Sequence, residues 1–425
     1  MTTQVTVPPP SPEPVVEPIT TSTRPAPDRS ASAGSVRADR AAGLRRRLDP
    51  RRLPAWAQAL LVFAASRVLV SYVAHRAADL AGLRGDGHRW TYWDIANNWD
   101  GTWYQRIAVQ GYPEQLPHDR AGAVAPNTWA FYPLFPRLAG TLADLTGLAW
   151  TPAATIVSVS CAIGAVLLMR NLLARVAGPR RALWGVALFS VFPASAVLQL
   201  PYAESLAVLL LVTVFWALQR GRYLLAVPAL LLLGVARPVA VPMAVVVTVH
   251  VVVRLRRDRD LRAAAGPVAA WLAAGLAAVE WPLIAWSGTG VPDAYTLTMA
   301  SWRTPHQVVP LRPWWTAGQL FLGGITGPVV LVLGVGGLFW WLTRPSARVI
   351  GTDLRVWCAA YICYLLAVLD SFTSLPRYLL PLFPFGVLLA SVSGSRAYRL
   401  ALTAGFAMLG VLWMLVIWRS RVWAP

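Results

Sequence analysis

The chain has 425 residues, of which 56% are hydrophobic and 13% charged, and its mean hydropathy is +0.51. Soluble domains carry about 25% charged residues, so the composition excludes an ordinary soluble enzyme. All 38 basic residues are arginines, against 19 acidic residues, and many stand in short clusters between apolar stretches. This placement is typical of a membrane protein and argues against nucleic-acid binding.

Residues 1–45 are rich in Pro, Ser, Thr and Ala and contain no apolar segment of the kind that a signal peptide needs. This composition predicts a disordered tail. Five arginines between positions 45 and 52 stand directly before the first apolar run. The positive-inside rule therefore places the tail in the cytoplasm, and residues 46–425 are expected to form one transmembrane domain.

Apolar runs suited to a hydrocarbon core of about 30 Å recur along the rest of the chain. They predict an all-α polytopic membrane protein with about eleven transmembrane helices. The expected spans lie at residues 54–77, 152–175, 182–199, 201–219, 223–236, 238–254, 264–286, 319–342, 355–370, 376–393 and 398–418.

The spans 223–236 and 355–370 are short, and Pro238 and Pro376 follow them at once. Each is therefore either a span or a re-entrant or broken helix. With eleven spans, the cytoplasmic connections are short and arginine-rich, and the outer face carries two long loops, residues 78–151 and 287–318. We expect an integral plasma (inner) membrane protein with an extracytoplasmic active site, because only those loops offer enough polar chain.

The first outer loop contains the densest group of unusual residues. If a helix starts at Asp100, then Asp100, Trp103, Tyr104 and Ile107 share one face. A carboxylate beside aromatic rings suits a sugar, and a partly desolvated carboxylate can act as a general base. The alternative is that Asp100 only caps the helix and that the aromatic residues form an interfacial belt.

Other carboxylates and arginines could join Asp100 at such a site. Asp94 could reach the same ligand only if the chain bends near positions 97 and 98. Glu204 begins an apolar span, where a charge is either functional or serves as a helix cap or a partner of Arg237.

Arg237 and Arg377 stand at the expected outer ends of spans, against the bias of the other arginines. A guanidinium group at that position suits the phosphate of a lipid-linked donor. The alternatives are snorkelling at a helix end, or structural pairing with Asp370 or Glu204.

Several motifs resemble those of the PIG-V-like mannosyltransferases, a branch of the GT-C glycosyltransferase superfamily. The most specific is Trp-Asp-Gly-Thr-Trp-Tyr at 99–104, followed by Ile-Ala at 107–108 and Gly-Tyr-Pro at 111–113, which is similar to the family signature WDxxxYxxIAxxGY. Weaker matches follow in the expected order, at residues 131–136 (FYPLFP), 202–206 (YAESL), 237–238 (RP) and 377–381 (RYLLP). Together they extend over most of the membrane domain.

The resemblance implies an inverting mannosyl transfer from a polyprenyl-phosphate donor to an acceptor hydroxyl on the outer side of the membrane. It also implies that Asp100 is the catalytic base, while the residues around it, Trp103, Tyr104, Asp94, Glu204, Arg237 and Arg377, are the candidates for substrate binding. Many GT-C enzymes have two adjacent acidic residues at this point, whereas Gly101 follows Asp100 here. That departure argues against a bound divalent metal, and no cofactor is assigned.

Two further points limit the function. A transporter or flippase of a lipid-linked sugar is the alternative, although such proteins favour internal repeats and ionisable residues near the bilayer midplane. The acceptor is open between a glycolipid, a polysaccharide and a secreted protein. The three cysteines lie in apolar runs without metal-ligand spacing, which predicts neither a disulfide framework nor a metal site.

Overall fold

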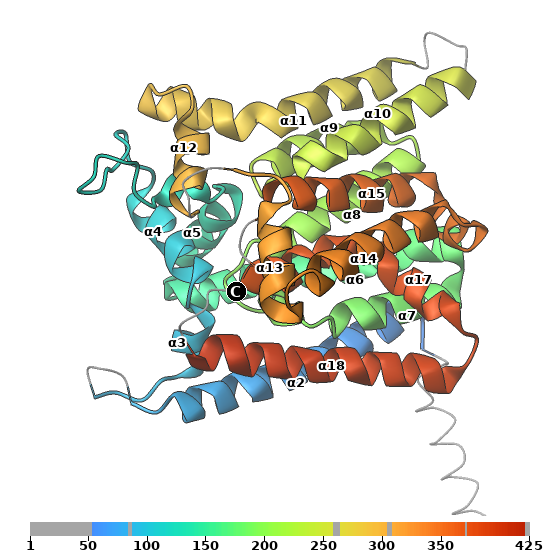
Figure 1. Cartoon of the computed structure of the whole chain (residues 1–425), viewed down its shortest axis with the longest axis horizontal. Coiled ribbons are helices and arrows are strands. Elements are labelled where there is room, and N and C mark those ends of the chain that lie inside the picture. Colours follow the sequence, from blue (N-terminus) through green and yellow to red (C-terminus); the bar gives the residue numbers. More distant parts are fainter. Residues whose placement is uncertain (1–52, 84–86, 258–263, 304–307, 370–371, 421–425) are drawn as a thin grey trace, which may run out of the picture. The chain divides into compact units, whose positions relative to one another are not determined.

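The computed structural model describes residues 53–83, 87–257, 264–303, 308–369 and 372–420. The chain divides into two compact units, residues 1–53 and 54–425, and the second unit is described below. The expected cytoplasmic tail, residues 1–45, lies outside the described residues. In chain order the α-helices are α2 (Ala55–Ala81), α3 (Tyr92–Ala96), α4 (Asp100–Gln110), α5 (Leu134–Thr146), α6 (Trp150–Ala177), α7 (Pro179–Ser190), α8 (Glu204–Gln219), α9 (Tyr223–Gly234), α10 (Ala240–Arg257), α11 (Ala265–Thr289), α12 (Ala294–Ser301), α13 (Arg312–Leu322), α14 (Thr326–Thr343), α15 (Gly351–Val368), α16 (Leu375–Tyr378), α17 (Pro384–Val392) and α18 (Arg396–Ser420) (Figure 1).

The all-α class expected from the sequence is confirmed. In the described part of the chain, extended residues pair only at two isolated bridges, Leu83 with Arg89 and His118 with Val124. Among the residues that the structure describes, six segments are long and apolar enough to cross a membrane, which makes the chain an integral membrane protein by length and composition. They are Ala55–Ala81, Trp150–Ala177, Ala265–Thr289, Thr326–Thr343, Pro345–Val368 and Arg396–Trp418.

The count of eleven spans stays a prediction, because several of the expected spans are short or interrupted helices. The expected helix 182–199 is wrong beyond Ser190, where α7 ends; Pro193 and a separate 3₁₀ turn at Ser195–Leu198 follow. The segment 376–393 is broken as well, into α16, a 3₁₀ turn at Leu380–Leu382 and α17. Proline has no backbone N–H to donate, so runs with several prolines break in this way.

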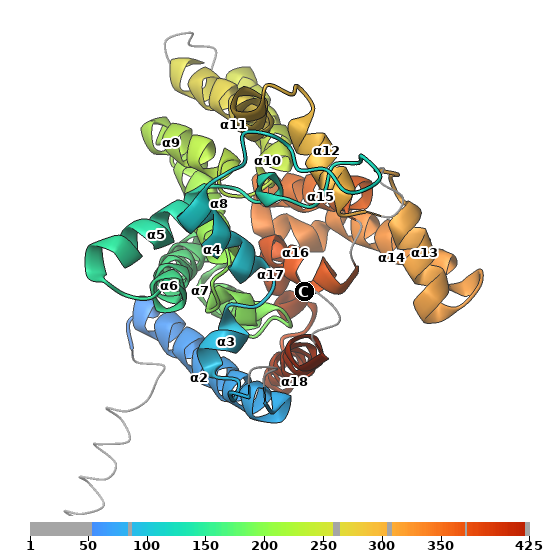
Figure 2. The same ribbon diagram turned by 90° about the vertical axis from the view of Figure 1, so that its left-hand side faces the viewer.

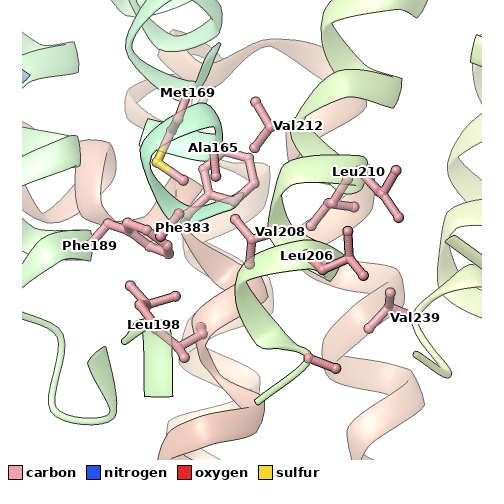
Figure 3. Close-up of a cluster of buried hydrophobic side chains, with 14 of the residues drawn as sticks. Ala165, Met169, Phe189, Leu198, Leu206, Val208, Leu210, Val212, Val239 and Phe383 are labelled. Carbon is pink, nitrogen blue, oxygen red and sulfur yellow. The ribbon is translucent and has the colours of Figure 1, made fainter. Parts of the chain in front are cut away.

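Helix α8 is the centre of the membrane unit. Twelve of its residues are buried, including consecutive ones such as Leu206, Ala207 and Val208, so the helix is apolar on every side. Figure 3 shows Val208 and Val212 of α8 in one buried apolar cluster with Met169 of α6, Phe189 of α7 and Phe383. Because close packing immobilises α8, its first residue, Glu204, has a fixed position at the amino end of the helix.

The described part of residues 78–151 forms a helical layer at one end of the long helices. Figure 1 shows α3, α4 and α5 gathered at that end together with α12, and Figure 2 views this end face-on. The C-terminal helix anchors the layer, because the indole nitrogen of Trp418 donates a 2.9 Å hydrogen bond to the carbonyl of Ile95.

Candidate active site

A sharp bend separates α3 from α4 and sets the direction of Asp100. Trp99 adopts φ 60° and ψ −117°, a conformation that L-residues rarely occupy. The amide of Gly101 donates a 3.3 Å hydrogen bond to the carbonyl of Asn98, which closes the turn. Such a strained residue persists only where its surroundings impose it, and strain of this kind clusters at functional sites.

Side chains from other elements hold the bend in place. The hydroxyl of Tyr202 donates a 3.1 Å hydrogen bond to the carbonyl of Asn98. The side chain of Asn97 accepts from the indole of Trp150 at 2.9 Å and donates to Gln105 at 2.6 Å. The turn is therefore fixed both to α6 and to the segment before α8.

Four charged residues meet at the first turn of α4. The guanidinium of Arg377, on α16, donates from Nη1 to Oδ2 of Asp100. Its Nε lies 3.3 Å from Oε1 of Glu204, and Nη1 of Arg237 lies 2.7 Å from the same oxygen. Glu204, Arg237 and Arg377 are all buried, whereas the side chain of Asp100 keeps 16% of its surface exposed. The charged cluster, as we call these four residues, balances two carboxylates against two cations.

The cluster retains unused hydrogen-bonding capacity. Glu204 touches both arginines, but among the described residues neither of its oxygens accepts an aligned hydrogen bond. Within the same part of the structure, the side-chain nitrogen Nδ2 of Asn98 and the indole nitrogen of Trp99 are buried without partners. Buried polar groups are nearly always satisfied, so this concentration beside Asp100 marks a place suited to water or a polar ligand.

Two tyrosine rings enclose the guanidinium of Arg377. Its central carbon lies 5.4 Å from the ring centroid of Tyr202 and 5.2 Å from that of Tyr378, and Arg237 lies 5.5 Å from the latter ring. These cation–π contacts and the carboxylates allow charged groups to remain in an otherwise apolar setting.

Trp103 and Tyr104 follow Asp100 on α4, as the helical spacing predicted. Tyr104 is buried against Phe131 and Phe135. Burial raises the pKa of the Tyr104 phenol well above its ordinary value, so this group is not a candidate base. Trp103 is half-buried and stacks on Phe131 at 5.5 Å, and Trp302 of the second outer loop packs edge-on against it.

Asp94 has a structural task in this arrangement. Its carboxylate accepts hydrogen bonds from the backbone and the hydroxyl of Thr91, at 2.9 and 2.6 Å, and completes a capping box at the start of α3. The bend that Asp94 needs to reach the ligand of Asp100 is present. Its part in substrate binding stays a prediction, and Asp370, the possible partner of Arg377, lies outside the described residues.

An apolar cavity borders the opposite face of α16. It has a volume of about 470 Å³ and is lined only by apolar residues from α7, α13, α14, α15, α18 and the α16–α17 region. Leu375 and Leu379 in its wall stand one helical turn apart, whereas Arg377, two positions from each, lies on the other face of this short helix. Trp314, Trp341 and Phe406 also line the cavity. A hydrocarbon chain fits such a cavity, and its lining includes none of the four residues of the charged cluster.

The described residues can also be compared with what a metal site requires. Among the described residues, no group of three or more His, Cys, Asp or Glu side chains could hold a metal ion. The carboxylates of Asp100 and Glu204 face arginines, which are not metal ligands.

The sequence patterns did not assign Tyr202, Tyr378 or Trp302 to the site, whereas residues 131–136 were a candidate wall of the donor groove. Tyr202 had the clearest signal, because it stands two positions before Glu204 in the motif YAESL. Trp302 had none, since only the folded chain brings the second outer loop against α4.

Comparisons with known proteins identify no family. No family model and no curated protein matches the chain. Solved structures of the Archaeoglobus fulgidus oligosaccharyltransferase are similar at 12% identity: one with zinc and sulfate (TM-score 0.40, covering 84% of this chain and 52% of that one), one tethered with an acceptor peptide (0.38, 85% and 56%) and one with an inhibitory peptide and a dolichol-phosphate (0.38, 84% and 55%). This chain therefore spans about half the length of those proteins. The likeness concerns the arrangement of helices, and no activity is assigned from it.

Proposed function

We propose that this protein is an inverting membrane glycosyltransferase that moves mannose from a polyprenyl-phosphate donor to an acceptor hydroxyl on the outer side of the membrane. The carboxylate of Asp100 takes the proton of the acceptor hydroxyl while that oxygen attacks C1 of the sugar. The bond between C1 and the phosphate oxygen breaks, and its electron pair leaves with polyprenyl phosphate. Asp100 then releases the proton to water.

The observation that carries this proposal is the contact between Asp100 and Arg377. Such a transfer needs a carboxylate and a cation close together, one to accept a proton and one to stabilise the phosphate as it leaves. Asp100 is partly exposed and can meet an acceptor, while Arg377 is fixed by Glu204 and two tyrosine rings. A planar guanidinium is well suited to a phosphate group.

Two further features favour a lipid-linked donor. The apolar cavity has Leu375 and Leu379 in its wall, so a polyprenyl chain in the cavity would lie against α16, the short helix that carries Arg377. Trp103, one turn after Asp100, would meet the sugar with the part of its ring that Phe131 and Arg106 leave uncovered. The choice of mannose rests on the sequence signature in residues 99–113.

The test is transfer of radiolabelled mannose from polyprenyl-phosphate mannose by the purified protein, with a membrane lipid extract as acceptor. We expect turnover by the wild type and none by Asp100→Asn. The matched control is Asp144→Asn, which removes the same charge from an exposed position at the end of α5 and should retain activity.

The outcomes separate the alternatives. Full transfer by a folded Asp100→Asn protein would remove Asp100 from its role as base. If the wild type binds the lipid-linked sugar and moves it across the vesicle membrane without transferring the sugar to an acceptor, the result would favour a flippase. Transfer of another sugar would keep the reaction class and correct the donor.

A further inference from the structure

Arg377 serves two carboxylates with different parts of one guanidinium group. Nε faces Glu204 at 3.3 Å, and Nη1 donates to Asp100. Glu204 is 3% exposed at the side chain and is also held by Arg237, so this contact is deep and shared. Asp100 is the more exposed partner, at 16%.

This geometry restricts how an anion can approach Arg377. The side chain of Arg377 is only 4% exposed. The rings of Tyr202 and Tyr378 cover it, and Glu204 occupies the deep side. The side of Asp100, the more exposed of the two carboxylates, is therefore the side from which a phosphate group would reach the guanidinium and compete for Nη1.

We propose that the donor phosphate takes the place of Asp100 at Nη1 of Arg377, and that donor binding is thereby the event that frees the catalytic base. This inference rests on the proposed function and deepens it. Glu204 keeps Nε in place throughout, so Arg377 does not have to move. No covalent bond changes in this step, in which one anion exchanges for another at a fixed cation.

The exchange has a chemical consequence for Asp100. While Oδ2 of Asp100 accepts a hydrogen bond from Nη1 of Arg377, the acceptor hydroxyl has to compete with the guanidinium for that oxygen. Once the phosphate has taken Nη1, Oδ2 is free to accept the hydrogen bond of the acceptor hydroxyl. The enzyme would then bind the donor before the acceptor hydroxyl is activated, and Glu204 acts as a positioning residue.

The test measures binding without turnover. Polyprenyl phosphate, which carries no sugar, is titrated into wild-type protein, Asp100→Asn and the control Asp144→Asn in lipid nanodiscs. We expect Asp100→Asn to bind about tenfold more tightly than the wild type, because one charge-assisted hydrogen bond no longer has to be given up. Asp144→Asn should match the wild type, which excludes a general effect of net charge.

A second pair of variants tests whether the increase in affinity for polyprenyl phosphate depends on Arg377. In an Arg377→Gln background, Asp100→Asn should give no increase in affinity, because the shared cation is absent. Thermal unfolding of each variant checks that it is folded, and Asp100→Ala serves as a second neutral variant if Asp100→Asn does not fold.

The results distinguish this inference from the function on which it rests. Equal or weaker binding by Asp100→Asn, or a gain that persists without Arg377, overturns the exchange even if the wild type transfers mannose. If none of the folded proteins binds polyprenyl phosphate, both the exchange and the proposed donor are overturned.

Discussion

The phenol of Tyr202 donates a hydrogen bond of 3.1 Å to the carbonyl of Asn98, the residue before the strained Trp99. Tyr202 is fully buried, and its ring also lies against Arg377. One side chain therefore touches both the turn that directs Asp100 and the cation that pairs with it. The relative position of base and cation depends on this residue.

Tyr202→Phe should lower the rate of transfer more than it weakens donor binding. The ring and its contact with Arg377 remain, but the bond that fixes the turn is lost, at a cost of about 1 kcal/mol in the free energy of unfolding. Steady-state kinetics should show a reduced kcat with a donor KM near that of the wild type. Tyr398→Phe, which removes a 3.2 Å bond from a phenol to the carbonyl of Leu389, is the control and should leave kcat unchanged.

At Trp99 a glycine variant should be more stable than an alanine variant, which is the reverse of the order at an ordinary helical position. Its positive φ favours glycine, so Trp99→Gly should be about 1 kcal/mol more stable than Trp99→Ala. Both variants lose the same indole, which isolates the effect of the backbone. Thermal unfolding measures the difference.

The control for Trp99 is Thr102, an exposed position inside α4. There Thr102→Ala should be more stable than Thr102→Gly by about 0.8 kcal/mol, the usual helix propensity. If both positions prefer alanine, Trp99 does not adopt the strained conformation in solution.

Glu204→Gln should destabilise the fold markedly. Two buried arginines would lose their common counter-charge, and removing one partner from a buried ion pair typically costs about 3 kcal/mol. The measurement is chemical or thermal unfolding in detergent. Glu114→Gln, an exposed carboxylate in the first outer loop, should stay within about 0.5 kcal/mol of the wild type. Equal stability of the two variants would contradict the buried cluster.

Filling the apolar cavity should affect long lipids selectively. Leu338 of α14 lines the cavity, and Leu338→Trp would take space from a hydrocarbon chain. We expect about tenfold weaker binding of a long polyprenyl phosphate, from the loss of a few buried CH₂ groups at about 0.8 kcal/mol each. A short-chain analogue that does not reach the cavity should bind as before.

Leu333→Trp provides the comparison for the cavity on the same helix. Leu333 is 68% exposed and is not among the residues of the cavity wall. If both tryptophan variants weaken long-chain binding equally, the lipid does not occupy the cavity.

The sequence foresaw the local features of the site. Spacing alone predicted that a helix from Asp100 aligns Trp103 and Tyr104, and α4 begins at Asp100. It also proposed Glu204 as a partner of Arg237, and the two are 2.7 Å apart. One inference used the helical spacing of side chains, and the other used the energetic cost of an isolated charge in an apolar segment. Both can be recognised in the sequence without knowledge of tertiary contacts.

The sharp turn at Trp99, before α4, was harder to predict from the sequence. A bend near positions 97 and 98 was needed to bring Asp94 towards Asp100, but the sequence could not indicate that a tryptophan would adopt a positive φ. That conformation is unfavourable locally and is imposed by Tyr202, Trp150 and the packed helices. Local propensity fails at such a residue because distant contacts outweigh it.

By itself, the sequence determined that this is a helical membrane protein with unusual charged and aromatic residues in the segments between its apolar runs, since hydropathy and periodicity are local properties. Only the tertiary structure decided which charges meet. Asp100 and Arg377 are 277 positions apart, and the choice between Glu204 and other partners depends on how α4, α8 and α16 pack. The pairing energy of buried ions depends on mutual distance and exclusion of water, and folding alone sets both.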